Sequence, residues 1–171
     1  MFDRYTEKAR RVIFFARLEA GNAGSEHIEP EHLLIGVLQE ERPLFDRMLG
    51  EQGGSVLLFM QLQQPAAIPG IAPQADMPLA ETAKRVLVRA TEEADAQKQH
   101  YIDCIHLLLG LLHEQSRARE ILSEFGITAD RVRADGADLV AHQRFHELRH
   151  RFAPLVSQLA NESEPAFTFL P

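Results

Sequence analysis

Two stretches of this sequence, Ile28-Glu-Pro-Glu-His-Leu-Leu-Ile-Gly36 and Ile102-Asp-Cys-Ile-His-Leu-Leu-Leu-Gly110, repeat one pattern at an offset of 74 residues. The same offset aligns residues 5–40 with residues 79–114. A repeat of this length indicates a duplicated helical unit that buries its apolar face against its own copy. Because there are two copies only, we predict a closed tandem pseudo-dimer and not a solenoid. Identical residues at this offset include Ala9/Ala83, Val12/Val86, Ala16/Ala90, Ala20/Ala94, His32/His106, Leu33/Leu107, Leu34/Leu108 and Gly36/Gly110.

The spacing of apolar residues around these stretches predicts an all-α fold. Thr6 is a good N-cap for a helix that ends near Gly21 or Gly24, and Pro30 suits the first turn of a short buried helix. No alternating pattern typical of strands competes with the helical spacing. Further helices are expected at about residues 43–50, 55–63, 80–97, 104–114 and 116–125, and from Thr128 towards Phe152.

Proline and glycine divide the chain into parts. Residues 64–78 contain four prolines and cannot continue a helix, so they are expected to link the two copies. We therefore predict one domain over residues 1–152, with repeat one at 1–63, the linker at 64–78 and repeat two at 79–152. The last part of repeat two forms a C-terminal helical extension, and residues 153–171 form a loosely held tail.

Composition limits the classes of function. The chain has 171 residues, 45% of them apolar, and no window approaches the ~18 apolar residues of a membrane helix. The first residues lack the layout of a secretory signal, so we expect a cytoplasmic protein without a membrane partner. A formal charge of −7 argues against binding nucleic acid. The single cysteine, Cys104, precedes an apolar run and is expected to be a core residue.

One motif suggests an enzyme. The stretch His146-Glu-Leu-Arg-His150 fits H-E-x-x-H, in which two histidines on one helix face bind zinc and Glu147 acts as general base. A third ligand is missing at the positions of the extended motif, where Ala153 and Val156 stand. We therefore favour a solvated helix face and no metal or other cofactor. A zinc-dependent hydrolase using His146 and His150 remains the alternative, and a metal assay distinguishes the two.

Two further observations bear on chemistry. None of the ten glycines is followed by lysine, so the sequence has no phosphate-binding loop for nucleotide hydrolysis. His32 and His106 occupy equivalent positions in the two copies. Such equivalence favours a structural role, for example at a helix start, over acid–base catalysis.

The sequence resembles the Clp N-terminal repeat domain, a double repeat that precedes the ATPase rings of Clp protein unfoldases, and is most similar to the ClpC type. The resemblance rests on residues 2–9 (FDRYTEKA), on the stretch at 28–36 and on its copy at 102–110. It covers about residues 1–140 and implies two four-helix repeats that dock adaptor and substrate proteins. The ATPase part has no counterpart in the 171 residues.

The resemblance also implies a candidate site. In ClpC-type domains, a threonine that begins the first helix of each repeat and a glutamate of the repeat motif contribute to binding phosphorylated arginine. Repeat one keeps these residues as Thr6 and Glu31, whereas repeat two has Ala80 and Ile105. At most one such site is therefore expected. The alternative is that Thr6 caps its helix and Glu31 complements a helix dipole.

These observations favour a non-catalytic protein-binding module linked to Clp-dependent protein quality control. Its expected partners are a Clp-type ATPase, adaptor proteins or unfolded substrate proteins. Besides the zinc hydrolase, a stress-linked regulatory interaction protein is a further alternative.

Overall fold

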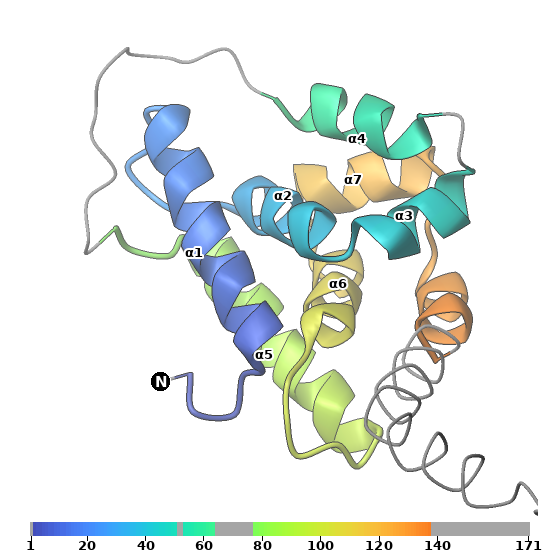
Figure 1. The fold of residues 1–171 in the computed structure, drawn as a ribbon. Coiled ribbons are helices and arrows are strands. Elements are labelled where there is room, and N and C mark those ends of the chain that lie inside the picture. Colours follow the sequence, from blue (N-terminus) through green and yellow to red (C-terminus); the bar gives the residue numbers. More distant parts are fainter. Residues whose placement is uncertain (1, 51–52, 64–76, 138–171) are drawn as a thin grey trace, which may run out of the picture. The chain divides into compact units, whose positions relative to one another are not determined.

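The structure is a computed structural model that describes residues 2–50, 53–63 and 77–137. The regular secondary structure of the described residues is helical. They also contain two isolated β-bridges, but these do not extend into strands. This confirms the predicted all-α fold (Figure 1). Residues 129–137 are also helical. The named helices are α1 (Glu7–Asn22), α2 (Pro30–Glu40), α3 (Arg42–Leu49), α4 (Gly54–Leu62), α5 (Glu81–Ala96), α6 (Cys104–His113) and α7 (Arg117–Glu124).

The described helices belong to one compact unit, which ends at Gly136. A second unit, Ala137–Pro171, lies almost wholly outside the described residues. The predicted domain end at residue 152, the tail and most of the linker therefore also lie outside them. None of the described helices is long and apolar enough to cross a membrane.

Two pairs of backbone contacts join the repeats in the same way. Tyr5 bridges to Ile102, and Ile28 bridges to Leu79, so each bridge maps onto the other at the offset of 74. The hydrogen bonds repeat as well: the amide of Thr6 donates to the carbonyl of Ile102 at 3.0 Å, and that of Ala80 donates to the carbonyl of Ile28 at 3.1 Å. The predicted tandem pseudo-dimer is confirmed, with its copies joined at the starts of their first helices.

Close helix crossings hold each repeat together. α1 packs on α2, and α5 packs on α6, through glycines at equivalent positions. A methyl group on Gly36 would lie 2.5 Å from the carbonyl oxygen of Val12, and one on Gly110 would lie 2.5 Å from that of Val86. The missing side chain therefore lets two backbones approach closely. The core around these crossings includes the fully buried Leu33, Leu34, Leu107, Leu108 and Leu109.

The equivalent histidines cap the central helices, as their positions predict. The Nδ1 atom of His32 accepts a hydrogen bond from the backbone amide of Glu29 at 3.0 Å, and that of His106 accepts one from Asp103 at 2.9 Å. Each amide lies at the start of its own helix, where no intrahelical acceptor is available. Both histidines are buried, so each cap belongs to the core.

Candidate protein-docking site

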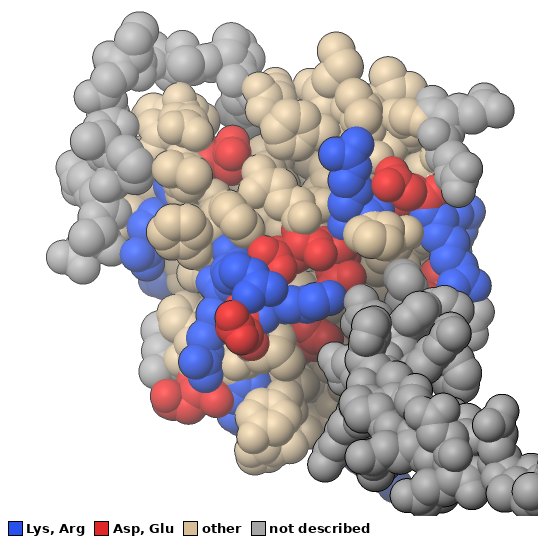
Figure 2. Space-filling model, viewed as in Figure 1, with Lys and Arg blue, Asp and Glu red and all other residues tan. Residues whose placement is uncertain are grey.

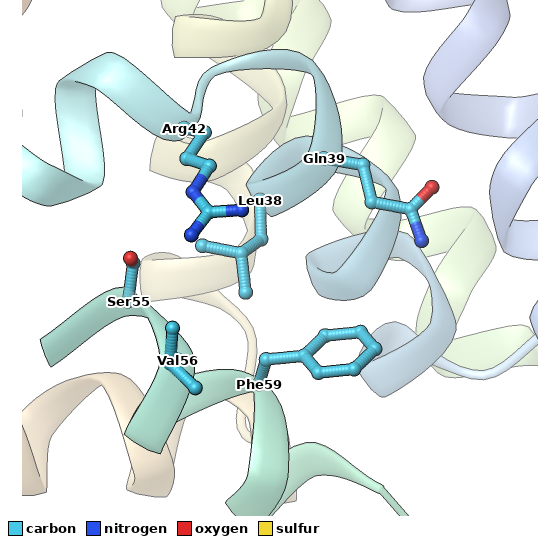
Figure 3. A pocket seen from close by; sticks show the side chains of 6 residues that line it. All are labelled: Leu38, Gln39, Arg42, Ser55, Val56 and Phe59. Atoms are coloured by element: carbon cyan, nitrogen blue, oxygen red, sulfur yellow. The ribbon is translucent and has the colours of Figure 1, made fainter. Parts of the chain in front are cut away.

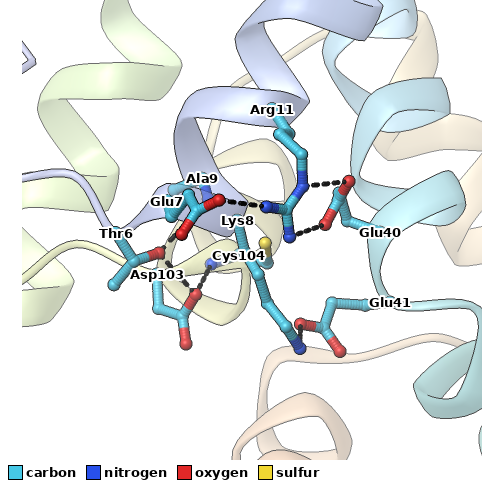
Figure 4. A network of polar contacts seen from close by, with 9 residues as sticks. All are labelled: Thr6, Glu7, Lys8, Ala9, Arg11, Glu40, Glu41, Asp103 and Cys104. Atoms are coloured by element: carbon cyan, nitrogen blue, oxygen red, sulfur yellow. Dashed lines mark hydrogen bonds and ion pairs between the residues drawn. The ribbon is translucent and has the colours of Figure 1, made fainter.

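The start of α1 carries the first candidate residue, Thr6. Its hydroxyl oxygen accepts a hydrogen bond from the amide of Ala9 at 3.2 Å, which confirms the predicted N-cap. The same hydroxyl donates to Oδ1 of Asp103 at 2.9 Å, and this oxygen also accepts from the amide of Cys104 at 2.8 Å (Figure 4). Thr6 therefore connects the first helix of repeat one to the second helix of repeat two.

Ion pairs fasten the same part of α1 to the end of α2. Arg11 donates two hydrogen bonds of 2.9 Å to the two carboxylate oxygens of Glu40 and a third, of 3.0 Å, to Glu7. Lys8 binds Glu41 at 2.8 Å. Burial alone would lower the pKa of Lys8, but the hydrogen bond and charge of Glu41 raise it overall. Figure 2 shows basic and acidic side chains lying together over this part of the face, so the surface here is polar and internally paired.

Cys104 lies beneath this network and is fully buried. Burial raises the pKa of its thiol, and the neighbouring charges of Asp103 and Glu41 raise it further. The thiol therefore stays protonated, and the prediction of a core cysteine is confirmed. Possible ligand atoms of Glu41, Asp103 and Cys104 lie within 4.8 Å of one another. Because Lys8 already binds Glu41 and the thiol is protonated, this group is poorly suited to a metal ion.

Glu31, the second candidate residue, lies in the first turn of α2 and is 9% exposed. Burial raises the pKa of its carboxyl group, and the charge of Glu29 adds to this effect. Hydrogen bonding to the backbone of Glu31 and of Ala118, together with the charge of Arg117, opposes the rise. Glu31 is therefore a buried carboxyl group beside the start of α7, where the positive end of a helix favours negative charge.

Thr6 and Glu31 lie at opposite ends of the α1–α2 pair. Lys8 and Arg11, near the start of α1, contact the last residues of α2, whereas Glu31 is nine residues before Glu40. Nine helical residues span about 14 Å. The two residues therefore do not meet, and a phosphoarginine site at either stays a prediction.

Each candidate residue instead faces the other repeat. Thr6 contacts Asp103, and the carboxyl group of Glu31 lies beside Arg117 and Ala118 of α7. A second junction joins the repeats at Glu29, which accepts a hydrogen bond from Thr82 of α5 at 3.3 Å. At that second junction Ala80 stands where Thr6 stands at the first. The sequence suggested a site made of two residues of the same repeat. In the structure, the contacts at each junction join residues of different repeats.

The metal-binding alternative falls in another part of the chain. His146, Glu147 and His150 lie outside the described residues. The hydrolase hypothesis is therefore neither strengthened nor weakened by the geometry.

Comparison with known proteins identifies the family. The family described as the Clp repeat (R) N-terminal domain matches residues 79–163. The chain contains a Clp repeat N-terminal domain. It is 31% identical over 135 residues to the chloroplastic chaperone protein ClpC1 of Oryza sativa subsp. japonica, a match that covers 78% of this chain and 15% of the rice protein. It is 28% identical over 134 residues to the chaperone protein ClpB of Oceanobacillus iheyensis, covering 78% of this chain and 17% of that protein.

Solved structures show the same fold. The Hsp104 N-terminal domain from Candida albicans superposes with a TM-score of 0.63 at 24% identity, covering 80% of this chain and 91% of that one. The N-terminal domain of ClpD from Arabidopsis thaliana gives a TM-score of 0.60 at 22% identity, covering 82% and 97%. Because this chain spans 15–17% of the two full-length relatives described above, it corresponds to their Clp N-terminal part.

Sequence reasoning missed a groove in this Clp N-terminal domain. It lies between the segment that precedes α1 and one face of α5, and has a volume of about 490 Å³. Val88, on the α5 side of the groove, is 57% exposed. The polar pattern of α5 could have marked Val88 as a surface residue, but the second wall of the groove comes from residues far away in sequence. The lining residues are Phe2, Asp3, Arg4, Tyr5, Lys84, Leu87, Val88, Thr91 and Ile102.

Thr6→Ala is expected to lower the free energy of unfolding of the Clp N-terminal domain by about 1–2 kcal/mol. The substitution removes the N-cap of α1 and leaves Asp103 without the hydroxyl that it binds across the repeats. Urea denaturation followed by circular dichroism measures the loss. Thr6→Ser keeps the hydroxyl and should stay near wild type; equal losses for both variants would contradict this role.

Proposed function

We propose that this chain is a non-catalytic docking module that binds adaptor or unfolded substrate proteins for a Clp-type ATPase in protein quality control. The observation that supports the proposal most is that the chain shares both sequence and two-repeat fold with the N-terminal parts of Clp chaperones. A cytoplasmic location remains a prediction, since two of the similar relatives are chloroplastic.

The groove beside α5 suits this function. Its apolar lining includes the buried side chains of Leu87 and Ile102 and the exposed side chain of Val88. Lys84 and Arg4 stand at its edge. Unfolded proteins expose apolar side chains that folded proteins bury, so an open apolar groove with a polar edge selects for them.

The phosphoarginine site implied by the family resemblance is a finer form of this proposal. Glu31 offers a carboxylate for a guanidinium, and the start of a helix offers amides for a phosphate. The buried carboxyl group of Glu31 lies beside the start of α7, whereas Ala80, which has no hydroxyl, begins α5 at the junction with Glu29. We therefore place recognition of unfolded chains at the α5 groove and keep Thr6 and Glu31 as proposed secondary contacts.

Val88→Asp is expected to weaken binding of an unfolded client by about tenfold, because a charge would be placed on the apolar lining of the groove, where a bound client would desolvate it. The probe is fluorescein-labelled, reduced and carboxymethylated α-lactalbumin, and the measurement is fluorescence anisotropy at fixed salt. Val88→Ile keeps the groove apolar and serves as the matched control. If wild-type protein binds the client and Val88→Asp binds equally well, docking takes place elsewhere on the domain.

A further inference from the structure

A second hollow lies on repeat one, where the end of α2 and the start of α3 face α4. It has a volume of about 410 Å³, and Figure 3 shows the side chain of Leu38 on α2 pointing toward α4, between Val56 and Phe59. We call it the α4 groove. It is lined by Leu38, Gln39, Arg42, Ser55, Val56 and Phe59.

The outer face of α4 extends this apolar surface. Val56 is 45% exposed, Leu57 59% and Met60 65%. Single exposed apolar residues are common, but three on one short helix beside an open apolar hollow form a patch. Such a patch typically marks a surface that another molecule covers.

The duplicated repeat provides an internal control for this patch. The helical segment at 129–137 occupies the position of α4 at the offset of 74, and the buried residues keep that offset: Leu58 corresponds to the buried Val132, and Leu62 to the buried Gly136. The outer positions differ in character. Val56, Leu57, Phe59 and Met60 correspond to Asp130, Arg131, Arg133 and Ala134. Folding of the repeat therefore does not require large apolar residues at the outer positions.

Repeat two closes the corresponding position with charge. Arg133, the counterpart of Phe59, binds the two carboxylate oxygens of Glu93 at 2.9 and 3.1 Å. Glu93 also lies 2.9 Å from the ring of His113.

In repeat one the same three positions are Phe59, Glu19 and Gln39, and Gln39 donates to Glu19 at 3.4 Å. An aromatic ring thus takes the place of the arginine that completes the ion-pair network in repeat two. The difference leaves an apolar hollow in one repeat and a closed polar contact in the other.

An exposed arginine lies at one end of the α4 groove. The side chain of Arg42 is 64% exposed, and its Nε atom lies 3.8 Å from Asp46. Asp46 also accepts a hydrogen bond from Ser55. An adjoining hollow of about 550 Å³ shares Arg42 with the groove and is lined by Arg47 as well. Arg47 lies 3.6 Å from Asp135, so the exposed guanidinium of Arg42, with its longer contact to Asp46, is the group at this end that can bind a carboxylate.

We propose that the α4 groove docks an amphipathic segment of a partner protein, with apolar side chains on Leu38, Val56 and Phe59 and a carboxylate against Arg42. The inference rests on the proposed docking function and assigns it a second surface, separate from the α5 groove. The apolar part of the groove supplies most of the binding, and Arg42 sets the direction of the bound segment.

The test uses two fluorescein-labelled alanine-based helical peptides with leucine and phenylalanine on one face. One peptide ends in glutamates and the other in lysines. Wild-type protein should bind the glutamate peptide more tightly. Val56→Asp and Phe59→Arg, which introduce the residue types of repeat two, should each weaken binding about tenfold. Arg42→Glu should reverse the preference between the peptides.

Circular dichroism confirms that each variant is folded, and the exposed position of Val56 provides one variant with little risk to the core. Equal binding of the glutamate peptide by wild type and Val56→Asp overturns the proposal. The proposal is also overturned if the wild-type protein sediments as a dimer and Val56→Asp sediments as a monomer, because a second copy of the chain would then cover the groove.

The unfolded-client assay separates the two proposals. Client binding that depends on Val88, without peptide binding at the α4 groove, leaves the docking function standing and rejects this site. Peptide binding at the groove without any client binding rejects the proposed function instead.

Discussion

Replacing Gly110 with alanine is expected to lower the free energy of unfolding by about 2–3 kcal/mol. The added methyl group would lie 2.5 Å from the carbonyl oxygen of Val86 and 3.1 Å from the amide nitrogen of Ala90. Both are backbone atoms in a packed helix, so α5 and α6 must move apart to accept the methyl group. The better helix propensity of alanine, about 1 kcal/mol, offsets only part of this cost. Urea denaturation followed by circular dichroism measures the change.

Gly136→Ala is the matched control for this prediction. Its methyl group would lie 2.7 Å from Cδ1 of Ile105, the flexible end of a side chain that can rotate away. We therefore expect a small change in stability of either sign. Gly36→Ala should behave like Gly110→Ala, because its methyl group would lie 2.5 Å from the carbonyl oxygen of Val12. Similar stabilities for all three variants would contradict the close helix crossings.

Acid is expected to destabilise the domain through its two capping histidines. Burial lowers the pKa of His32 from 6.5 to about 4. Burial also lowers the pKa of His106, although the charges of Asp103 and Glu93 oppose it. Between pH 4 and pH 6.5, the unfolded chain binds a proton at His32 that the folded chain does not bind, so the free energy of unfolding rises with pH. The contribution of His32 is complete above about pH 6.5 and is lost as the pH falls towards 4, a loss of about 3 kcal/mol.

The double variant His32→Asn/His106→Asn isolates this effect. Asparagine offers an oxygen that can accept the hydrogen bond from the helix start but does not titrate in this range. The free energy of unfolding, measured by urea denaturation from pH 4 to 7.5, should therefore depend less steeply on pH in the variant. Replacing the exposed His27 with asparagine should leave the wild-type slope unchanged. A wild-type slope in the double variant would show that other groups govern the acid response.

Much of the fold could be predicted from the repeated sequence. Equivalence of His32 and His106 pointed to a structural role, and both prove to be helix caps. Thr6 was expected as an N-cap and is one. These features depend on residues close together in sequence, where spacing alone determines which atoms can meet.

The arrangement of the candidate site could not be predicted in this way. Thr6 and Asp103 are 97 residues apart, and they meet because one isolated bridge joins Tyr5 to Ile102. A bridge of one residue pair is too short to produce the alternating sequence pattern by which strands are recognised. The resemblance placed Thr6 and Glu31 in one site, yet the antiparallel packing of α1 and α2 separates them.

The two grooves were missed for a related reason. Each brings together side chains from segments that meet only in the folded chain: α2, α3 and α4 in one groove, and residues 2–5, α5 and Ile102 in the other. Repeating the comparison of the two copies on the outer face would have shown the contrast between Phe59 and Arg133. The sequence does not show, however, that Arg133 binds Glu93, and it is this ion pair that makes the position polar in repeat two, whereas it is apolar in repeat one.

We propose above that this Clp N-terminal domain docks unfolded proteins. The most direct test is the affinity of the wild-type chain for labelled, reduced and carboxymethylated α-lactalbumin, measured by anisotropy beside the native, disulfide-bonded protein. We expect saturable binding of the unfolded form, weak or no binding of the native form, and weaker binding in Val88→Asp. Equal affinity for both forms, or no binding of either, would contradict it.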